Sequence, residues 1–181
     1  MTDGVPEATL VDGGAGLAPA TDGWFVLPTK DAVWDESADF GRFTRWEGEG
    51  EARFREVGIN LSSLQPGQKM CMYHGEDAQE DFLVLAGEGI LIVEGQERPV
   101  RAWDFVHCPP WARHVIVAAG DSPFVVLAVG ARSGRTGLVY PRDEAALRHG
   151  AGVERETGDP AEAYAESDRG RPVRYVEGDL P

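Results

Sequence analysis

The sequence contains only two cysteines, Cys71 and Cys108, among its 181 residues. Two cysteines are too few for a disulfide framework, so we expect reduced thiols in or near the core. No apolar run approaches the roughly 20 residues that cross a bilayer, and the N-terminus has neither the basic nor the apolar region of a secretory signal. We therefore expect a cytoplasmic protein with no membrane partner.

Positive charge is also scarce. The chain has 17 Lys+Arg against 31 Asp+Glu, a formal net charge of -14, and no cluster of basic residues. A phosphate backbone would be repelled, and no helix-turn-helix pattern is present, so nucleic acid is not an expected partner. The nucleophile elbow of hydrolases, the phosphate loop and the dinucleotide glycine fingerprint are absent as well. A small molecule is the partner that the composition favours.

Glycine and proline are plentiful, with 23 Gly and 12 Pro. They separate short segments rich in β-branched and aromatic residues, and such segments recurring about every 8–12 residues predict an antiparallel sandwich or barrel. The expected strands cover residues 54–64, 70–76, 80–89, 90–95, 98–110, 114–120 and 123–130. The sequence thus predicts an all-β fold, an antiparallel β-barrel of jelly-roll type.

The chain divides into three parts. Residues 1–22 contain no aromatic residue and are expected to form a flexible N-terminal tail. Residues 23–140 should form the barrel with its N-terminal strands, beginning with large apolar side chains from Trp24. Residues 141–181 should form a C-terminal helix and an arm, with the helix at 143–150 opened by acidic residues and ended by Gly150.

Four potential metal ligands lie in the predicted barrel: His74, Glu76, Glu80 and His114. Residues two apart on a strand point to the same face, so His74 and Glu76 should look the same way. A turn would bring Glu80 to the start of the next strand, and His114 begins a later one. The four side chains could therefore converge inside the barrel.

Two imidazoles with one or two carboxylates suit a divalent ion such as Fe(II), Mn(II), Zn(II), Ni(II) or Co(II). Buried without an ion, the same groups would cost several kcal/mol, roughly, unless paired or neutralised. The alternative is that these residues lie at exposed strand ends and form surface hydrogen bonds, which is the usual situation of a lone His or Glu.

Two segments resemble the motifs of the cupin family. The first is PGQKMCMYHGEDAQEDFLVLAGEG, in which His74, Glu80 and Gly87 match the family's spacing. The second is WDFVHCPPWARHVIVA, in which Pro109 and His114 match. The resemblance covers roughly residues 60–130. It implies a jelly-roll barrel with a metal held by His74, Glu76, Glu80 and His114.

The departures from the family pattern affect the expected site. Glu76 stands where the family usually has a second His, which favours Mn(II) or Fe(II), with Zn(II) or Ni(II) less favoured. If Glu76 does not bind, His74, Glu80 and His114 remain as a facial set of two His and one carboxylate. Trp103 and Trp111 stand where the family has Gly. We expect both tryptophans to pack under the N-terminal aromatic segment.

Other residues share the predicted ligand face and are expected to line the pocket: Met70, Met72, Phe82, Val84 and Cys108. The alternative for each is an ordinary place in the core. By the same alternation His107 should face outward.

The resemblance implies either of two functions. The first is a metal-dependent enzyme of oxygenase or isomerase type acting on a small polar organic substrate. The second is a non-catalytic module that binds a small metabolite or sugar. Catalytic residues are not assigned by the sequence, because fold-level analogy does not choose a reaction. Cupins commonly pair, and a homodimer is expected.

Overall fold

The computed structural model describes residues 4–132 and 137–181. Its larger sheet is antiparallel and has the strand order β10-β7-β12-β5-β4-β3-β14. The strands are β3 (Trp34–Ser37), β4 (Gly41–Thr44), β5 (Val57–Leu64), β7 (Glu80–Ala86), β10 (Phe105–Cys108), β12 (Phe124–Ala131) and β14 (Arg171–Val173). Residues 1–3 of the expected tail and 133–136 of the expected barrel lie outside the described residues.

A second antiparallel sheet has the order β11-β8-β9, formed by β8 (Glu88–Val93), β9 (Gln96–Arg101) and β11 (His114–Ala119). Residues 68–74 run beside β11 as an irregular fourth strand, with isolated bridges at Lys69↔Val117 and His74↔His114. Two short strands, β6 (Gly75–Glu76) and β13 (Leu138–Val139), pair with each other. The two main sheets form the jelly-roll arrangement that the sequence predicts.

The core lies between these sheets and follows the alternation of the strands. It consists of Leu64, Phe82, Val84, Leu91, Val100, Val106, Cys108, Ile116, Ala118, Phe124, Val126 and Ala128, all buried. On β10 the pattern is fully visible, because Val106 and Cys108 are buried whereas Phe105 and His107 are exposed. The outward position predicted for His107 is confirmed.

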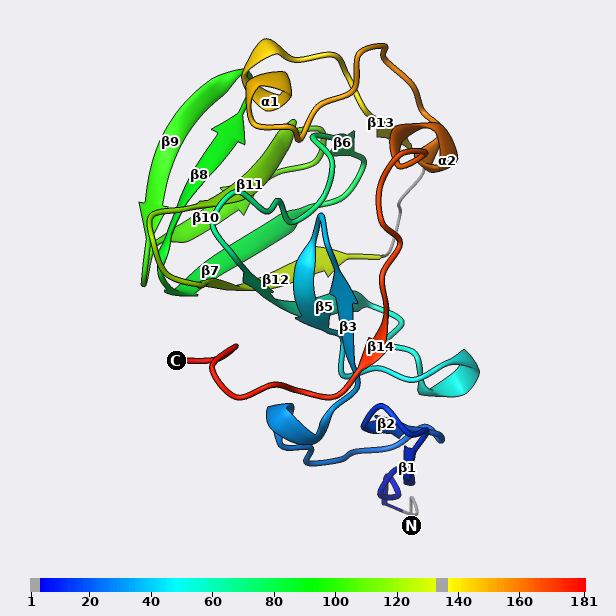
Figure 1. Cartoon of the computed structure of the whole chain (residues 1–181). Coiled ribbons are helices and arrows are strands. Elements are labelled where there is room, and N and C mark those ends of the chain that lie inside the picture. The colour runs from blue at the N-terminus through cyan, green and yellow to red at the C-terminus, as the bar shows by residue number, and fades with distance from the viewer. Residues whose placement is uncertain (1–3, 133–136) are drawn as a thin grey trace.

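The C-terminal part of the chain covers the outer faces of both sheets (Figure 1). Helix α1 (Glu144–Arg148) packs Ala145 and Ala146 on the smaller sheet. Its N-terminus is capped by Asp143, which accepts a hydrogen bond from Ala146 N at 2.9 Å. The predicted helix is thus confirmed, and a second helix, α2 (Pro160–Ala163), follows it unpredicted. Neither helix, nor any other in the described parts of the chain, is long and apolar enough to cross a membrane.

The N-terminal segment differs from the expected tail. Strands β1 (Leu10–Asp12) and β2 (Leu17–Pro19) pair with each other, and Ala8 is buried. Hydrogen bonds between the segments at Pro6–Ala8 and Trp24 tie the beginning of the segment to the aromatic region. Backbone pairing supplies two short strands here that the composition does not indicate, and the flexibility expected of residues 1–22 stays a prediction.

Two predicted strands differ in detail. The segment expected at 70–76 is a strand only over Gly75–Glu76, because the residues before it form irregular backbone beside β11. The segment expected at 98–110 contains two strands, β9 and β10, separated by a turn at residues 102–104.

Trp103 and Trp111 are not packed under the N-terminal aromatic segment. They are 74% and 48% exposed, so that expectation is wrong. Both have left-handed backbones, with φ of 75° and 70°. Glycine adopts this conformation readily and a bulky residue does not. The chain therefore keeps the glycine-type backbone at both positions although the side chains are large.

Glu47 and Arg132 tie the loop after β4 to the end of β12. Arg132 Nη1 and Nη2 donate to the two oxygens of Glu47 at 2.6 and 2.7 Å, and Phe54 N donates to the same carboxylate at 3.1 Å. Burial raises the pKa of Glu47, but the hydrogen bonds from Arg132 and Phe54 outweigh burial and hold the pKa below its ordinary value of 4.5. The carboxylate is therefore better stabilised in the folded state than in the unfolded state.

Replacing Glu47 by Gln should lower the free energy of unfolding by about 1–3 kcal/mol at neutral pH, because Arg132 loses a charged acceptor. Since folding lowers the pKa of Glu47, this contribution is present above the unfolded-state pKa and is lost as the pH falls through the folded-state pKa. Urea unfolding should therefore show the difference between wild type and E47Q shrinking below about pH 4.5. The control is E51Q in the same loop, where Glu51 is exposed. An equal loss in E51Q would contradict the assignment.

Candidate metal centre

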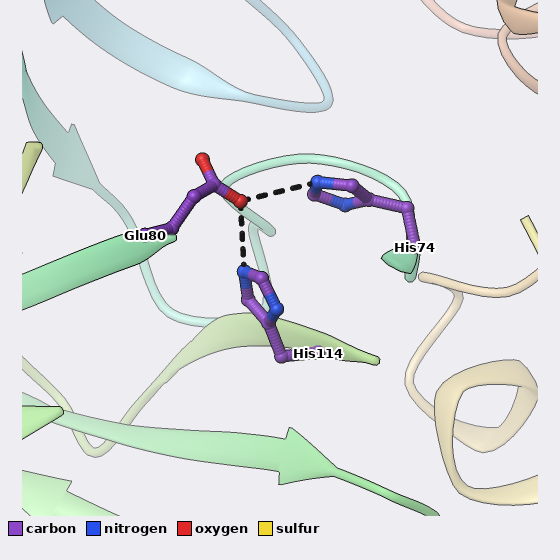
Figure 2. A group of neighbouring side chains, drawn as sticks. All are labelled: His74, Glu80 and His114. Carbon is purple, nitrogen blue, oxygen red and sulfur yellow. Dashed lines mark ion pairs between the residues drawn. The ribbon is translucent and has the colours of Figure 1, made fainter. Parts of the chain in front are cut away.

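Three of the four predicted ligands meet in space. Figure 2 shows the carboxylate of Glu80, the first residue of β7, next to the imidazoles of His74 and His114. His114 begins β11, and His74 lies opposite it at the end of the segment that runs beside β11. The backbone N–H of each of these histidines donates to the carbonyl of the other, at 2.8 and 3.2 Å. Backbone pairing therefore fixes the two imidazoles side by side.

Both imidazoles are oriented by backbone carbonyls two residues upstream. His74 Nδ1 lies 2.9 Å from Met72 O, and His114 Nδ1 lies 2.8 Å from Ala112 O. A carbonyl accepts only, so Nδ1 carries the hydrogen and donates, and in the neutral ring Nε2 keeps a lone pair. This arrangement is typical of metal-binding histidines, whose second ring nitrogen is held by an acceptor.

The two free ring nitrogens and the carboxylate surround one point. His74 Nε2 and His114 Nε2 lie 3.3 and 3.1 Å from Glu80 Oε2, and one ligand atom from each residue lies within 4.8 Å of the others. Neighbouring ligands held about 2.0–2.2 Å from an ion would themselves be roughly 3 Å or slightly more apart. The observed separations fit this spacing.

Burial makes the cluster costly without a cation. Glu80 Oε2 and His114 Nε2 are buried and make no hydrogen bond with a described residue, although they are close together. Unsatisfied buried polar atoms of this kind are rare and expensive. An ion bound between them would satisfy both, so the donor set fits a divalent metal.

The pKa of each of the three groups is shifted in the direction that favours its charged form: the pKa of both histidines is raised and that of Glu80 is lowered. For His114, burial lowers the pKa, but contacts with Cys108 and Glu80 outweigh it and raise the pKa to about 10. For Glu80, burial raises the pKa, but the two histidines hold it well below its ordinary value. In the metal-free protein an ionised Glu80 beside protonated imidazole is thus favoured. A positive charge next to this carboxylate is therefore stabilising.

These residues form part of the wall of a cavity of about 370 Å³. Its remaining lining includes four aromatic residues contributed by segments outside the two cupin motifs, Phe40, Phe43, Tyr140 and Tyr164. Tyr164 Oη accepts a hydrogen bond from Met72 N at 3.1 Å. The size suits a small molecule rather than a polymer.

Glu76 lines the same cavity and is 4% exposed, but its carboxylate is not part of the three-residue cluster. Short strand β6, which carries it, pairs with β13 rather than with the main sheets. Direct ligation by Glu76 stays a prediction. The geometry brings together His74, Glu80 and His114, the set of two His and one carboxylate that the sequence analysis gave as the alternative.

The predicted pocket residues separate into two groups. Met70 and Phe82 are among the residues that line the cavity. Met72 does not, because the irregular backbone before His74 breaks the alternation, and its side chain is buried with Tyr140 and Ala163. Val84 and Cys108 lie in the core between the sheets rather than on the cavity wall.

The sequence reasoning missed several polar residues of this wall. Arg45, Asn60 and Ser62 reach the cavity from the end of β4 and from β5. Alternation along β5 gives Asn60 and Ser62 a shared face, which is a usable signal. Which cavity that face meets depends on pairing with strands distant in the chain, and the local pattern does not carry that information.

The comparisons with known proteins agree with this architecture. A sequence model described as a cupin domain matches residues 60–130, the span that contains the three clustered residues. This match and the fold identify residues 60–130 as a cupin domain. The N-terminal strands and the C-terminal helices lie outside the matched span.

Solved structures show the same fold. A sugar phosphate isomerase of the cupin superfamily from Silicibacter pomeroyi is 22% identical, with 67% of this chain and 88% of that chain covered and a TM-score of 0.52. A predicted oxalate decarboxylase from Thermotoga maritima is 19% identical, with 59% and 98% covered and a TM-score of 0.52. A putative sugar phosphate isomerase from Acidithiobacillus ferrooxidans is 29% identical, with 54% of this chain and 63% of that chain covered and a TM-score of 0.46. The match thus spans less than two thirds of that protein. No curated protein matches this chain in sequence.

Adding Mn(II) or Fe(II) at about 100 times the dissociation constant to wild-type protein freed of metal with a chelator should stabilise it by about 2.7 kcal/mol, or about 5–10 °C in melting temperature. The variants E80Q and H114A should lose this shift, because each removes one of the converging atoms. H107A is the matched control, since His107 is 51% exposed and pairs with Asp81 at 2.7 Å outside the cluster. Thermal unfolding with and without metal measures the effect. An unchanged shift in H114A would contradict the assignment.

Proposed function

We propose that this cupin holds a divalent metal ion on His74, Glu80 and His114 and acts on a small polar organic molecule in the adjoining cavity. The observation that supports this most is the pair of buried atoms, Glu80 Oε2 and His114 Nε2, that lie 3.1 Å apart and make no hydrogen bond with any residue that the structure describes. Three protein ligands leave coordination positions for a substrate.

Two nitrogens and one carboxylate oxygen suit Fe(II) or Mn(II), and the same set accepts Zn(II) or Ni(II). When bound, the ion would polarise a substrate oxygen or provide a site for redox chemistry. The two carbonyls at Met72 and Ala112 keep the imidazoles in the required tautomer. The protein thus supplies a preformed set of ligands at one end of the cavity.

The residues around the ligands give this cavity its chemical character. Aromatic rings of Phe40, Phe43 and Tyr140 limit the access of water to the bound molecule. Burial raises the pKa of Tyr164, and Cys71 and Tyr140 raise it further, so its hydroxyl stays protonated and can donate a hydrogen bond. Glu76 is the carboxylate in position either to serve as a fourth ligand or to accept a proton from the substrate.

The proposed reaction is of oxygenase or isomerase type. Solved cupin structures with similar folds carry the names of an isomerase and a decarboxylase, and at their identities of 22% and 19% they support the fold alone. Two further expectations, a cytoplasmic location and a homodimer, stay predictions.

Protein purified without added metal should contain close to one equivalent of Fe or Mn, and the content should fall about tenfold or more in E80A and H74A, since even partners one shell further out change metal affinity 10–100-fold. H107A should keep the wild-type content. Elemental analysis by plasma mass spectrometry measures this. Metal at background in wild type would overturn the proposed centre.

Replacing Glu76 by Gln separates its two roles. If Glu76 transfers a proton, E76Q should keep the metal content while turnover falls by about 10²–10⁴-fold, the usual contribution of a general base. If Glu76 is a ligand, metal content and selectivity should change first. A metal-loaded wild type that binds small molecules but converts none, with dioxygen uptake and product formation both measured, would favour the non-catalytic binding module.

A further inference from the structure

We infer that the molecule bound in this cavity carries an anionic group, a carboxylate or a phosphate, and that Arg45 recognises this group at the end of the cavity opposite the metal ligands. The inference rests on the proposed metal centre and goes beyond it by naming the substrate class. The register of the larger sheet, the state of the Arg45 side chain and the charge of the cavity wall support it.

The register places Arg45 on the same face of the sheet as Glu80. Phe82 on β7 pairs with Ala128 on β12, and Ala128 pairs with Asn60 on β5. On the far side of β5, Thr44 pairs with Leu61, so the next residue, Arg45, continues beside Asn60. One row across the sheet thus leads from Phe82, two residues after Glu80, to Arg45. All four residues of this row line the cavity: Phe82, Ala128, Asn60 and Arg45.

The row also sets the scale of the ligand. Strands β7 and β4 are separated by β12 and β5, which at about 4.8 Å per strand is roughly 14 Å between backbones. Glu80 and Arg45 both extend from those backbones into the cavity, which leaves space for a molecule with a few bonds between its two polar ends. The cavity of about 370 Å³ agrees with a ligand of that size.

Arg45 is available for a ligand in a way that its neighbours are not. Arg42 is held by Asp179 at 2.9 Å and by Arg174 O at 2.6 Å. Arg132 is held by the bidentate pair with Glu47. Arg45, in contrast, is 54% exposed and makes one long ion pair, with Asp35 at 3.6 Å, which is beyond hydrogen-bond distance. Its planar fork of donors can exchange this loose pair for a carboxylate or phosphate bound in bidentate fashion.

The charges of the cavity wall favour an anion. Among the lining residues that the structure describes, Arg45 is the only Lys or Arg, and Glu76 and Glu80 are the carboxylates. A divalent ion on neutral histidines balances the two carboxylates, and Arg45 then leaves one positive charge. This local charge stands in a chain whose net charge is -14, so it is not a by-product of a basic surface.

The experiment uses Mn(II)-loaded protein and three probes that share a 2-hydroxycarboxylate end and differ at the other end: 2-hydroxypentanoate with a methyl, 2-hydroxyglutarate with a carboxylate, and 3-phosphoglycerate with a phosphate. Isothermal titration calorimetry should show at least one of the two probes with a second anionic group binding about tenfold or more tightly than 2-hydroxypentanoate, since a hydrogen bond to a charged group contributes about 1.5–3 kcal/mol, which is a factor of roughly ten or more. The tighter of these two probes identifies carboxylate or phosphate as the group that Arg45 recognises.

The variant R45M should lose this preference while its affinity for Mn(II) and for 2-hydroxypentanoate stays within about twofold of wild type. R45K should keep part of the preference, because it retains the charge without the bidentate geometry. R101M is the control, since it removes an exposed positive charge on β9 from the same acidic protein.

Two outcomes would overturn the inference, and they differ from each other. If wild type binds Mn(II) but does not prefer 2-hydroxyglutarate or 3-phosphoglycerate over 2-hydroxypentanoate, the role of Arg45 is wrong and the metal centre stands. The same holds if R45M keeps the preference. If wild type does not bind Mn(II), the proposed function and the inference fail together.

Discussion

The burial of one carboxylate between two imidazoles is the constraint on which the rest of this molecule depends. Glu80 Oε2 is out of solvent and makes no hydrogen bond within residues 4–132 and 137–181, so its charge needs a positive partner at a fixed place. The paired backbones of His74 and His114 fix that place, because a slip of one residue would turn an imidazole to the other face. On β12, Gly130 pairs with Glu80 and leaves space beside its carboxylate, since a Cβ at Gly130 would lie 3.3 Å from Glu80 Oε1.

The sequence predicted the strands and the three clustered residues because both have local signals. Alternation marks β5, apolar runs bounded by Gly, Pro or Asp mark β7, β8, β11 and β12, and motif spacing marks His74, Glu80 and His114. Met72 was misplaced because alternation holds only where the backbone is a regular strand, and residues before Gly75 are irregular. Arg45 was not found because its position depends on the pairing of β4 with β5 and β12, which is long-range. The paired N-terminal strands were missed for the same reason, since their composition alone resembles a tail.

Trp103 and Trp111 show that a family's backbone can persist where its residues have changed. The cupin motif has glycine at both places, and the left-handed φ of 75° and 70° is what glycine would adopt. A bulky residue in that conformation costs on the order of 1–3 kcal/mol unless its surroundings enforce it. At Trp111 they do so in part, because its N–H donates to Glu76 O at 2.7 Å. The turn that positions Glu76 and the start of β11 is thus kept at the expense of local strain.

The pairing of β14 with β3 joins residues far apart in the chain, for example Arg171 with Glu36, 135 positions away. Trp34 on β3 is fully buried and lies against Tyr175, with ring centroids 5.7 Å apart. During synthesis the cupin domain will have left the ribosome well before this last strand does. A nascent chain must therefore carry an uncovered tryptophan and an open sheet edge until residues 171–173 have emerged, which is a period of exposure to chaperones or to misassembly.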